Sequence, residues 1–406
     1  MKIYFLFIFL FITFVIHGQK VDIDNVYLNI SNCSLPINYI EPELRTYAVF
    51  LSGNSKFVGV DKEEQIKIFG WTKVSDESNS TLDIKVDIGY FNYGSPNSSS
   101  RVEEKKDKDG KVTGRVTHYK TTVANYSRGS MKIIGITNPL PPKVVSTKES
   151  KSDKKNKEKE QKLASNPFLQ NVDLNSTSPQ SSDTKEEVYS YSLDKEYVFD
   201  SGEHSTPSAA YKRYADNAGN IRNENENDFR NNYTKWINNY NNKYYGYAPV
   251  NNYVRFKKLD SKKHPEFIMF ENAVAAMKEV FGKMRYNKPI DEIQNDLLPL
   301  VNYFDEVSRK YAGDDKDNIK LRAACLYNLA RINQYLDHHD RVIELAGQFA
   351  TFSKRDAKAS EKFIEDSQEL KRTLAFHKMT SRHIVSLVVD ENDELGDKIE
   401  SADDED

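Results

Sequence analysis

The chain has 406 residues, of which 38% are hydrophobic and 29% are charged, and its 58 basic and 61 acidic side chains nearly cancel. This balance argues against a dedicated nucleic-acid-binding protein, which normally carries a strong basic excess. Two cysteines exclude a disulfide scaffold and a cysteine-rich zinc module. The length suits two or three domains, and the 24 tyrosines and 21 phenylalanines are enough to form ordered cores.

Residues 1–18 have the pattern of a secretory signal peptide. Met1 and Lys2 precede a short apolar run that ends in a small residue, Gly18. The run is short for a membrane-spanning helix, which needs about 20 apolar residues. We therefore predict cleavage after Gly18 and an exported protein that is periplasmic, outer-membrane-associated or extracellular; an uncleaved anchor is the weaker alternative. No later segment is apolar enough to be predicted as a transmembrane span.

The two cysteines are Cys33 and Cys325. Export permits a disulfide between them. The apolar, helical surroundings of Cys325 favour a buried free thiol instead.

Residues 21–138 follow a period near two, which is typical of half-buried strands. Asp107–Gly110 separates two highly charged runs, and an Asp-Gly pair between such runs predicts a hairpin that projects into water. The pattern predicts a β-rich domain, either a sandwich or an open barrel. The clearest strands are expected at residues 26–30, 46–51, 66–71 and 82–88.

Residues 139–185 begin with prolines and continue as a polar, charged stretch with almost no apolar content. Such a segment cannot bury enough surface to offset the entropy of ordering, so we predict a disordered linker or insertion. Strand patterning returns at residues 186–204, which we expect to complete the β domain.

Residues 205–388 change to a helical period, and we predict an all-α domain of five to seven antiparallel helices. Thr206 and Pro207 have the residue types of an N-cap and a first helical turn. The chain is therefore predicted to be an α+β multidomain protein that ends in an acidic disordered tail, residues 389–406. Helices are expected near residues 207–214, 221–245, 265–281, 289–307, 320–336, 341–352 and 359–376.

Residues 326–337 and 342–346 resemble a tetratricopeptide-type helix pair. Ala330 occupies the position where such helices approach most closely, whereas Val342 replaces a second small residue. Only about one 34-residue unit fits, and a solenoid needs roughly three repeats. The resemblance implies a helical domain that holds a peptide or a partner helix, not a regular superhelix.

The wider layout resembles a family of uncharacterised exported proteins from Bacteroidetes-type bacteria. The resemblance implies a location in or outside the cell envelope and brings no activity with it. The residues that carry it are Gly18-Gln19-Lys20, Arg45 to Val49, Lys105 to Lys111, His264-Pro265, Tyr327 to Ala330 and Ser381-Arg382-His383.

Motifs for catalysis and metal binding are weak. Residues 337–340 combine two histidines with two aspartates, but adjacent histidines on a helix lack the i, i+4 spacing that brings two imidazoles to one face. The better interpretation is a polar turn, and we predict no metal and no cofactor. No nucleophile elbow or phosphate-binding glycine loop is present in the sequence.

We predict a non-enzymatic protein of the cell envelope that binds a protein partner through its helical domain. The alternative is a carbohydrate- or peptidoglycan-binding protein whose β domain presents exposed rings, and an unrecognised hydrolase is a third class. Nucleic acid is not an expected partner. The candidate interaction residues are Trp71, Tyr90, Tyr93, Tyr327, Arg382 and His383.

Overall fold

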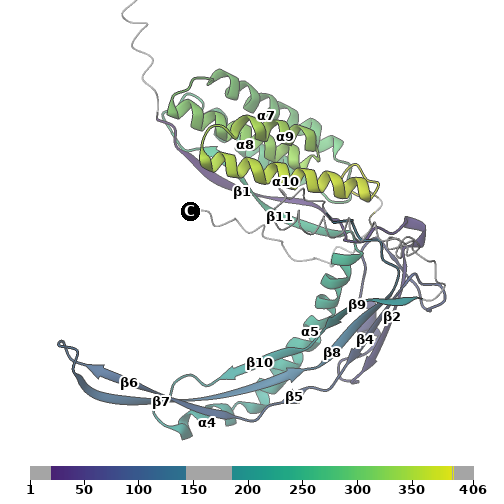
Figure 1. Cartoon of the computed structure of the whole chain (residues 1–406), viewed down its shortest axis with the longest axis vertical. Helices are drawn as coiled ribbons and strands as arrows, with labels where there is room; N and C mark the ends of the chain where they lie inside the picture. Colours follow the sequence, from purple (N-terminus) through teal and green to yellow (C-terminus); the bar gives the residue numbers. More distant parts are fainter. Residues whose placement is uncertain (1–19, 143–184, 386, 388–406) are drawn as a thin grey trace, which may run out of the picture.

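The computed structural model describes residues 20–142, 185–385 and 387. They form a mixed fold with a β-rich N-terminal part and a helical C-terminal part, which confirms the prediction at this level. Two lobes meet at one end and together give the molecule the outline of an open crescent (Figure 1). The predicted signal peptide, the acidic tail and all but the ends of the predicted linker lie outside the described residues.

The β lobe is built around one long strand path, β7 (Val112–Ser127) followed by β8 (Gly129–Gly135). Antiparallel strands flank this path on both sides, and parallel strands widen one end of it. On one side lie β4 (Leu82–Ile88), β5 (Asn92–Tyr93) and β6 (Asn97–Lys106); on the other lie β9 (Glu186–Ser192) and β10 (Lys195–Asp200). The widened end adds β2 (Thr46–Gly53) and β3 (Thr72–Lys73), with the short helices η2 (Pro42–Leu44) and α2 (Val60–Glu64) nearby.

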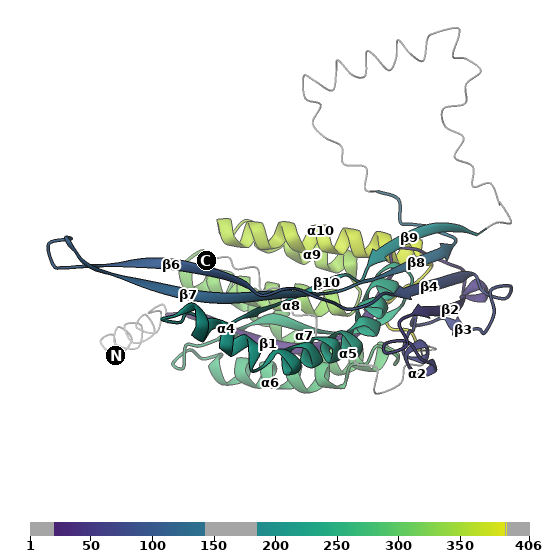
Figure 2. The same ribbon diagram turned by 90° about the horizontal axis from the view of Figure 1, so that it is seen from below.

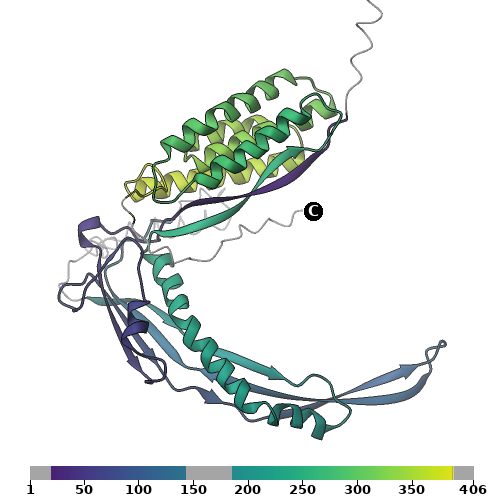
Figure 3. The same ribbon diagram turned by 180° about the vertical axis from the view of Figure 1, so that it is seen from behind.

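The predicted sandwich or barrel is wrong, because a helix covers the apolar face of the sheet. The helix is α5 (Ala218–Tyr244), and Figure 3 shows it running along the sheet. Phe229, Tyr233 and Ile237 of α5 are buried against strand residues such as Ile84. One long helix buries the apolar face without a second sheet, and the sheet stays open. A shorter helix, α4 (Pro207–Ala215), precedes α5 and begins at the predicted cap, where Thr206 Oγ1 accepts from the Ala209 N–H at 3.2 Å.

Asparagines of α5 explain why residues 66–71 are not the predicted strand. Ile66 is fully buried, but residues 66–68 have no regular structure and residues 69–70 form a turn, and side chains of α5 bond to the backbone where a partner strand would. Asn242 Oδ1 accepts from the Phe69 N–H at 2.8 Å, and Asn238 Oδ1 accepts from the Lys67 N–H at 2.9 Å. The Asn238 amide also donates to a backbone carbonyl, that of Gln65, at 2.8 Å. Asparagine is a poor helix former, but these asparagines of α5 form hydrogen bonds with backbone groups of residues 65–69 that no strand pairs with.

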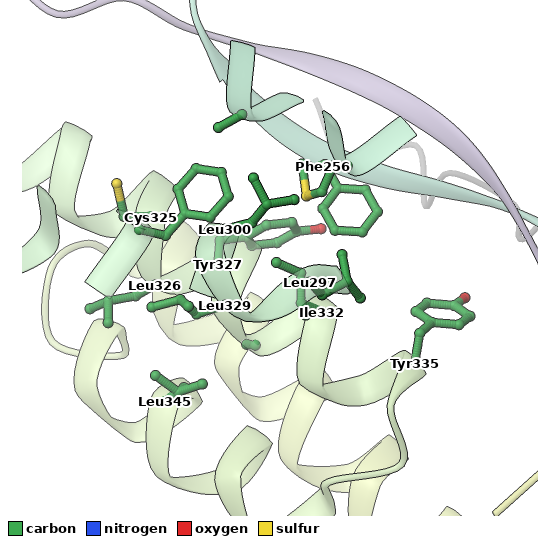
Figure 4. Packing of buried hydrophobic residues seen from close by; sticks show 14 of the residues in the cluster. Phe256, Leu297, Leu300, Cys325, Leu326, Tyr327, Leu329, Ile332, Tyr335 and Leu345 are labelled. Carbon is green, nitrogen blue, oxygen red and sulfur yellow. The ribbon is translucent and has the colours of Figure 1, made fainter. Parts of the chain in front are cut away.

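The helical lobe contains a strand pair that brings the N-terminal strand next to a segment more than 200 residues later in the sequence. β1 (Ile23–Ser34) runs antiparallel to β11 (Ala248–Leu259) over their whole length, and α6 and α8 pack against this ribbon. Leu28, Phe256 and Val254 enter the helical core, and Figure 4 shows Phe256 against α8 residues. The helices, each packed on the next along the chain, are α6 (Phe267–Lys283), α7 (Asp291–Lys310), α8 (Lys316–Tyr335), α9 (His339–Phe349) and α10 (Lys354–Phe376).

The predicted all-α unit at residues 205–388 therefore needs correction. Its first two helices, α4 and α5, pack on the β lobe. Of its remaining helices, α6 and α8 pack against a β ribbon, one strand of which comes from the N-terminal part of the chain. The period-two pattern of Val250, Val254 and Phe256 is typical of a strand and fits β11. No local pattern in the sequence indicates that β1 is its partner.

Asn328 of α8 closes the outer edge of β11. Its Oδ1 accepts from the Lys257 N–H at 2.7 Å, and its amide donates to the Lys257 carbonyl at 2.9 Å. The side chain therefore pairs with both backbone groups of one residue, as a neighbouring strand would. Unpaired strand edges are open to foreign strands, and Asn328 closes part of this one.

Candidate binding site at the junction of the lobes

Where the lobes meet, three side chains form a buried chain of hydrogen bonds. Arg45 Nη2 donates to Tyr247 Oη at 3.0 Å, and Tyr247 Oη lies 3.1 Å from His377 Nδ1. His377 Nε2 lies 2.9 Å from the Pro36 carbonyl oxygen, which can only accept. His377 therefore carries its proton on Nε2, and Nδ1 accepts from the tyrosine hydroxyl. The chain links the start of β2, the residue before β11 and the end of α10.

Burial sets the protonation of this network. It lowers the pKa of His377 to about 4, with the charge of Arg45 acting in the same direction and the hydrogen bond to Pro36 opposing it. Burial also raises the pKa of Tyr247 to about 12. A neutral imidazole and a neutral phenol are therefore held next to the Arg45 guanidinium.

A cavity of about 360 Å³ opens beside Arg45. We call it the junction cavity. Its wall includes Trp71 and Thr72 from the β lobe and Tyr247 between the lobes. Ile384, from the segment after α10, completes the apolar part of the wall.

The three candidate rings of the β lobe do not form one platform. Trp71 packs edge-on against Tyr245 at 5.7 Å between ring centroids, at the C-terminal end of α5. Tyr93 lies under the Arg222 guanidinium at 4.8 Å and bonds to Glu226. Glu226 and Tyr245 are about 28 Å apart at the rise of an α-helix. Tyr90 is 77% exposed, in the loop that leads to Tyr93. A sugar-binding face shared by Trp71 and Tyr93 is therefore excluded by position.

Tyr327 is a core residue and not a surface contact. It is 6% exposed and packs against Phe363 with 5.2 Å between ring centroids. Burial by itself would raise the pKa of Tyr327, but the charges and hydrogen bonds of Arg331 and Arg255 outweigh it and lower the pKa to about 8. The tyrosine joins α8 to the ribbon.

Arg382 and His383 fasten the C-terminal segment to the helical lobe. Arg382 Nε lies 2.8 Å from Asp337 Oδ1 in a pair that is almost fully buried, and Arg382 Nη2 donates to the Gln334 carbonyl. His383 Nδ1 lies 2.8 Å from the Arg285 carbonyl oxygen, and burial lowers the pKa of His383. The charge of Arg382, a candidate interaction residue, is therefore compensated by the chain's own Asp337.

The four side chains of residues 337–340 do not converge on one site, because they contact different partners. Asp337 binds Arg382, Asp340 binds Lys371, and His338 Nδ1 lies 3.2 Å from Asn333 Oδ1. His339 is buried, neither ring nitrogen has a hydrogen-bond partner among the described residues, and burial lowers its pKa. Over the described residues, no group of three potential ligands has the geometry to hold a metal ion.

Both cysteines are free and buried, and they lie in different clusters. Burial raises the pKa of Cys33 to about 12 and raises that of Cys325 as well. The open disulfide question is therefore answered in favour of free thiols. Among the helices the structure describes, none combines the length and the apolar character needed to cross a bilayer.

The network residues Arg45, Tyr247 and His377 were missed as site candidates by sequence reasoning. They are separated by 202 and 130 positions, so no local motif unites them. Comparison with known proteins gives no further guide, since no family model, no curated protein and no solved structure matches the chain. Function has to be inferred from the geometry of this chain.

Proposed function

We propose that this protein is exported, is not an enzyme, and works in the cell envelope by binding a protein partner. The observation that carries the proposal is the hairpin of β6 and β7, whose free part is residues 101–117. All ten residues of β6 are exposed, and Figure 2 shows the hairpin extending beyond the rest of the molecule. The signal-peptide pattern of residues 1–18 supports export.

The free hairpin has no core of its own. An isolated two-stranded hairpin is at best marginally stable in water. Here β7 continues into the lobe, where Val123 and Ser127 are buried, so the base is anchored while the tip stays free. The turn at the tip is formed by Asp107, whose Oδ1 accepts from the backbone N–H groups of Asp109 and Lys111. A surface of this kind contributes little to the fold and is available to a partner.

The distribution of charge along the hairpin indicates what kind of partner it could bind. Arg115 bonds to Glu104 across the strands, and Arg101 bonds to Glu203 at the base. Lys105, Lys106, Lys108 and Lys111 have no carboxylate partner among the described residues. Residues 105–111 carry these four lysines and two aspartates, so the tip has an excess of positive charge, which fits an acidic patch on a partner protein.

The helical lobe is a weaker candidate for the contact than its sequence suggests. The tetratricopeptide-like resemblance would leave a helix face for a partner, and Tyr327 and Asn328 of α8 lie on such a face. Both residues already contact β11 of the same chain. The chain's own ribbon therefore covers this face of α8.

Photo-crosslinking from the hairpin tests the proposal. A photoreactive amino acid replaces Val102, which is 55% exposed, in the full chain expressed in its own host. The matched control carries it at Ile268, which is 69% exposed on α6. We expect one protein to be captured from position 102 and not from 268, and to be lost when Lys105→Glu and Lys108→Glu are added. Capture from 268 alone would return the contact to the helical lobe, and no capture from either position would refute protein binding.

A further inference from the structure

Arg45 and Arg382 are both half-buried, but only one of them has a carboxylate partner. Arg382 has its carboxylate, Asp337, at 2.8 Å. Arg45 forms no ion pair with any carboxylate of the described residues, and the nearby Glu41 is bound to Lys378 and to Tyr39. Charges removed from water are normally paired. Arg45 therefore has no carboxylate in direct contact among the described residues, although the charge of Glu41 acts on it from nearby.

The guanidinium of Arg45 is held in a fixed position. Its Nε donates to the Ile40 carbonyl at 2.9 Å, its Nη2 donates to Tyr247, and its central carbon lies 4.5 Å from the centre of the Tyr247 ring. His377 fixes Tyr247 in turn. The remaining Nη1 has no acceptor among the described residues. A guanidinium that is already oriented loses little entropy when it binds a planar oxyanion.

The wall beside Arg45 is a ring surface. Trp71 is held by its Nε1–H, which donates to the Tyr245 carbonyl at 2.8 Å. Gly70 stands between the two residues at φ +78°, and a Cβ there would lie 3.2 Å from Tyr247 Cδ2. The glycine thus allows the backbone to lie directly on Tyr247. Thr72, which is exposed, adds a hydroxyl at the rim.

We propose that the junction cavity binds a small carboxylate attached to a ring, with the carboxylate on Arg45 and the ring against Trp71. Planar carboxylates match the guanidinium fork, and ring faces pack on indole. The ring can be that of an acidic sugar or of an aromatic acid. The junction cavity contains no residue of the hairpin, so this proposal can be tested independently of the proposed protein binding.

Tryptophan fluorescence provides a direct test. The chain has two tryptophans, and Trp236→Phe leaves Trp71 as the only reporter. Glucuronate and benzoate are titrated against this variant, with glucose and acetate as matched probes that lack the charge or the ring. We expect saturable quenching by glucuronate, by benzoate or by both, and the pattern identifies the ring type. Quenching by glucose equal to that by glucuronate, equal binding of acetate, or no saturable response to either acid overturns the proposal.

Variants locate the effect on Arg45. Arg45→Gln should weaken the binding of the acid by at least about tenfold, whereas Lys243→Gln, which removes an exposed cation outside the cavity wall, should leave it within about twofold. Because Arg45 also supports the network, Thr72→Tyr serves as a second variant that fills the rim without touching the guanidinium. It should abolish quenching with an unchanged melting temperature. Unchanged binding in both Arg45→Gln and Thr72→Tyr would refute the site.

Discussion

The two lobes differ in how they are completed, although each takes one element from the other half of the sequence. The helical lobe receives β1, which pairs with β11 along its full length and with no other strand in the part of the chain that the structure describes. The β lobe receives α5, which covers a sheet whose strands already pair with one another. We infer that the helical lobe depends on its foreign element for backbone pairing as well as burial, whereas the β lobe depends on α5 mainly for burial.

Removing β1 should give the largest effect. A chain that starts at Leu35 leaves β11 unpaired and exposes Phe256 and Val254, which are fully buried in the intact protein. We expect loss of cooperative unfolding in the helical lobe, measured by far-ultraviolet circular dichroism in urea. The control starts at Lys20 and should unfold like the full chain. An unchanged midpoint for the shorter chain would show that the helices stand alone.

Within the β lobe, the buried pair of Asp83 and Lys185 should be the most sensitive point. Asp83 is fully buried, and Lys185 Nζ lies 3.0 Å from both of its carboxylate oxygens. Asp83→Leu should lower the free energy of unfolding by about 3 kcal/mol, because it leaves a charge without its partner. Adding Lys185→Met should recover most of the loss.

The exposed pair of Lys132 and Glu187 in the same sheet provides the control. Their side chains are 51% and 44% exposed, and Glu187→Ala should change stability by at most about 1 kcal/mol. Equal effects of Asp83→Leu and Glu187→Ala in urea unfolding would show that burial of the first pair has no consequence.

The junction should make both lobes sensitive to acid through His377. Its pKa is lowered from 6.5 to about 4 by burial, so between these values the unfolded chain takes up a proton that the folded chain does not. The contribution of His377 to stability is complete above about pH 6.5 and is lost as the pH falls towards 4, by about 3 kcal/mol in all.

His377→Gln isolates this contribution. Glutamine can donate to the Pro36 carbonyl and accept from Tyr247, but it does not titrate. Melting temperature against pH should therefore fall less steeply between pH 6.5 and 4 in the variant. Parallel curves for the two proteins would contradict the role of His377.

In both lobes, asparagine side chains form hydrogen bonds with the backbone of a neighbouring segment. Two asparagines of α5, one with such a bond and one without, allow this contribution to be tested. Asn242→Ala leaves the Phe69 N–H buried without an acceptor, which should cost about 1–3 kcal/mol. Asn232, on the same helix, bonds only to Asp228 at the surface. Asn232→Ala should therefore change the unfolding free energy by less than about 0.5 kcal/mol. Similar costs would mean that the contact with residues 65–69 is incidental.

The same asparagines mark the limit of what sequence patterns predict. The strand at residues 82–88, the turn at Asp107–Gly110 and most helices follow from local periodicity, which local structure obeys. Residues 66–71 have strand periodicity but pair with side chains of α5. Only the three-dimensional packing reveals this, as it reveals the pairing of β1 with β11.

The candidate site was less predictable than the fold for the same reason. Trp71 was chosen as an exposed ring, and it does line the junction cavity, but its partners there are Arg45 and Tyr247 and not Tyr90 or Tyr93. Arg382 was chosen as a candidate interaction residue, yet its charge is paired with that of Asp337 in the same chain. Whether a charge is compensated depends on contacts between distant segments, which composition does not report.

The hairpin tip is the part of the β lobe that extends away from the core, and substitutions there should have the smallest effect on stability. Glu104 and Arg115 form an exposed cross-strand pair at 3.0 Å, with side chains 39% and 69% exposed. Such pairs contribute about 0–1 kcal/mol, so a double-mutant cycle of Glu104→Ala and Arg115→Ala should give a coupling energy below about 0.5 kcal/mol. The core pair of Asp83 and Lys185 should give several times as much in the same assay. A large coupling at the tip would mean that the hairpin stabilises the fold, and its availability to a partner would then lose its main support.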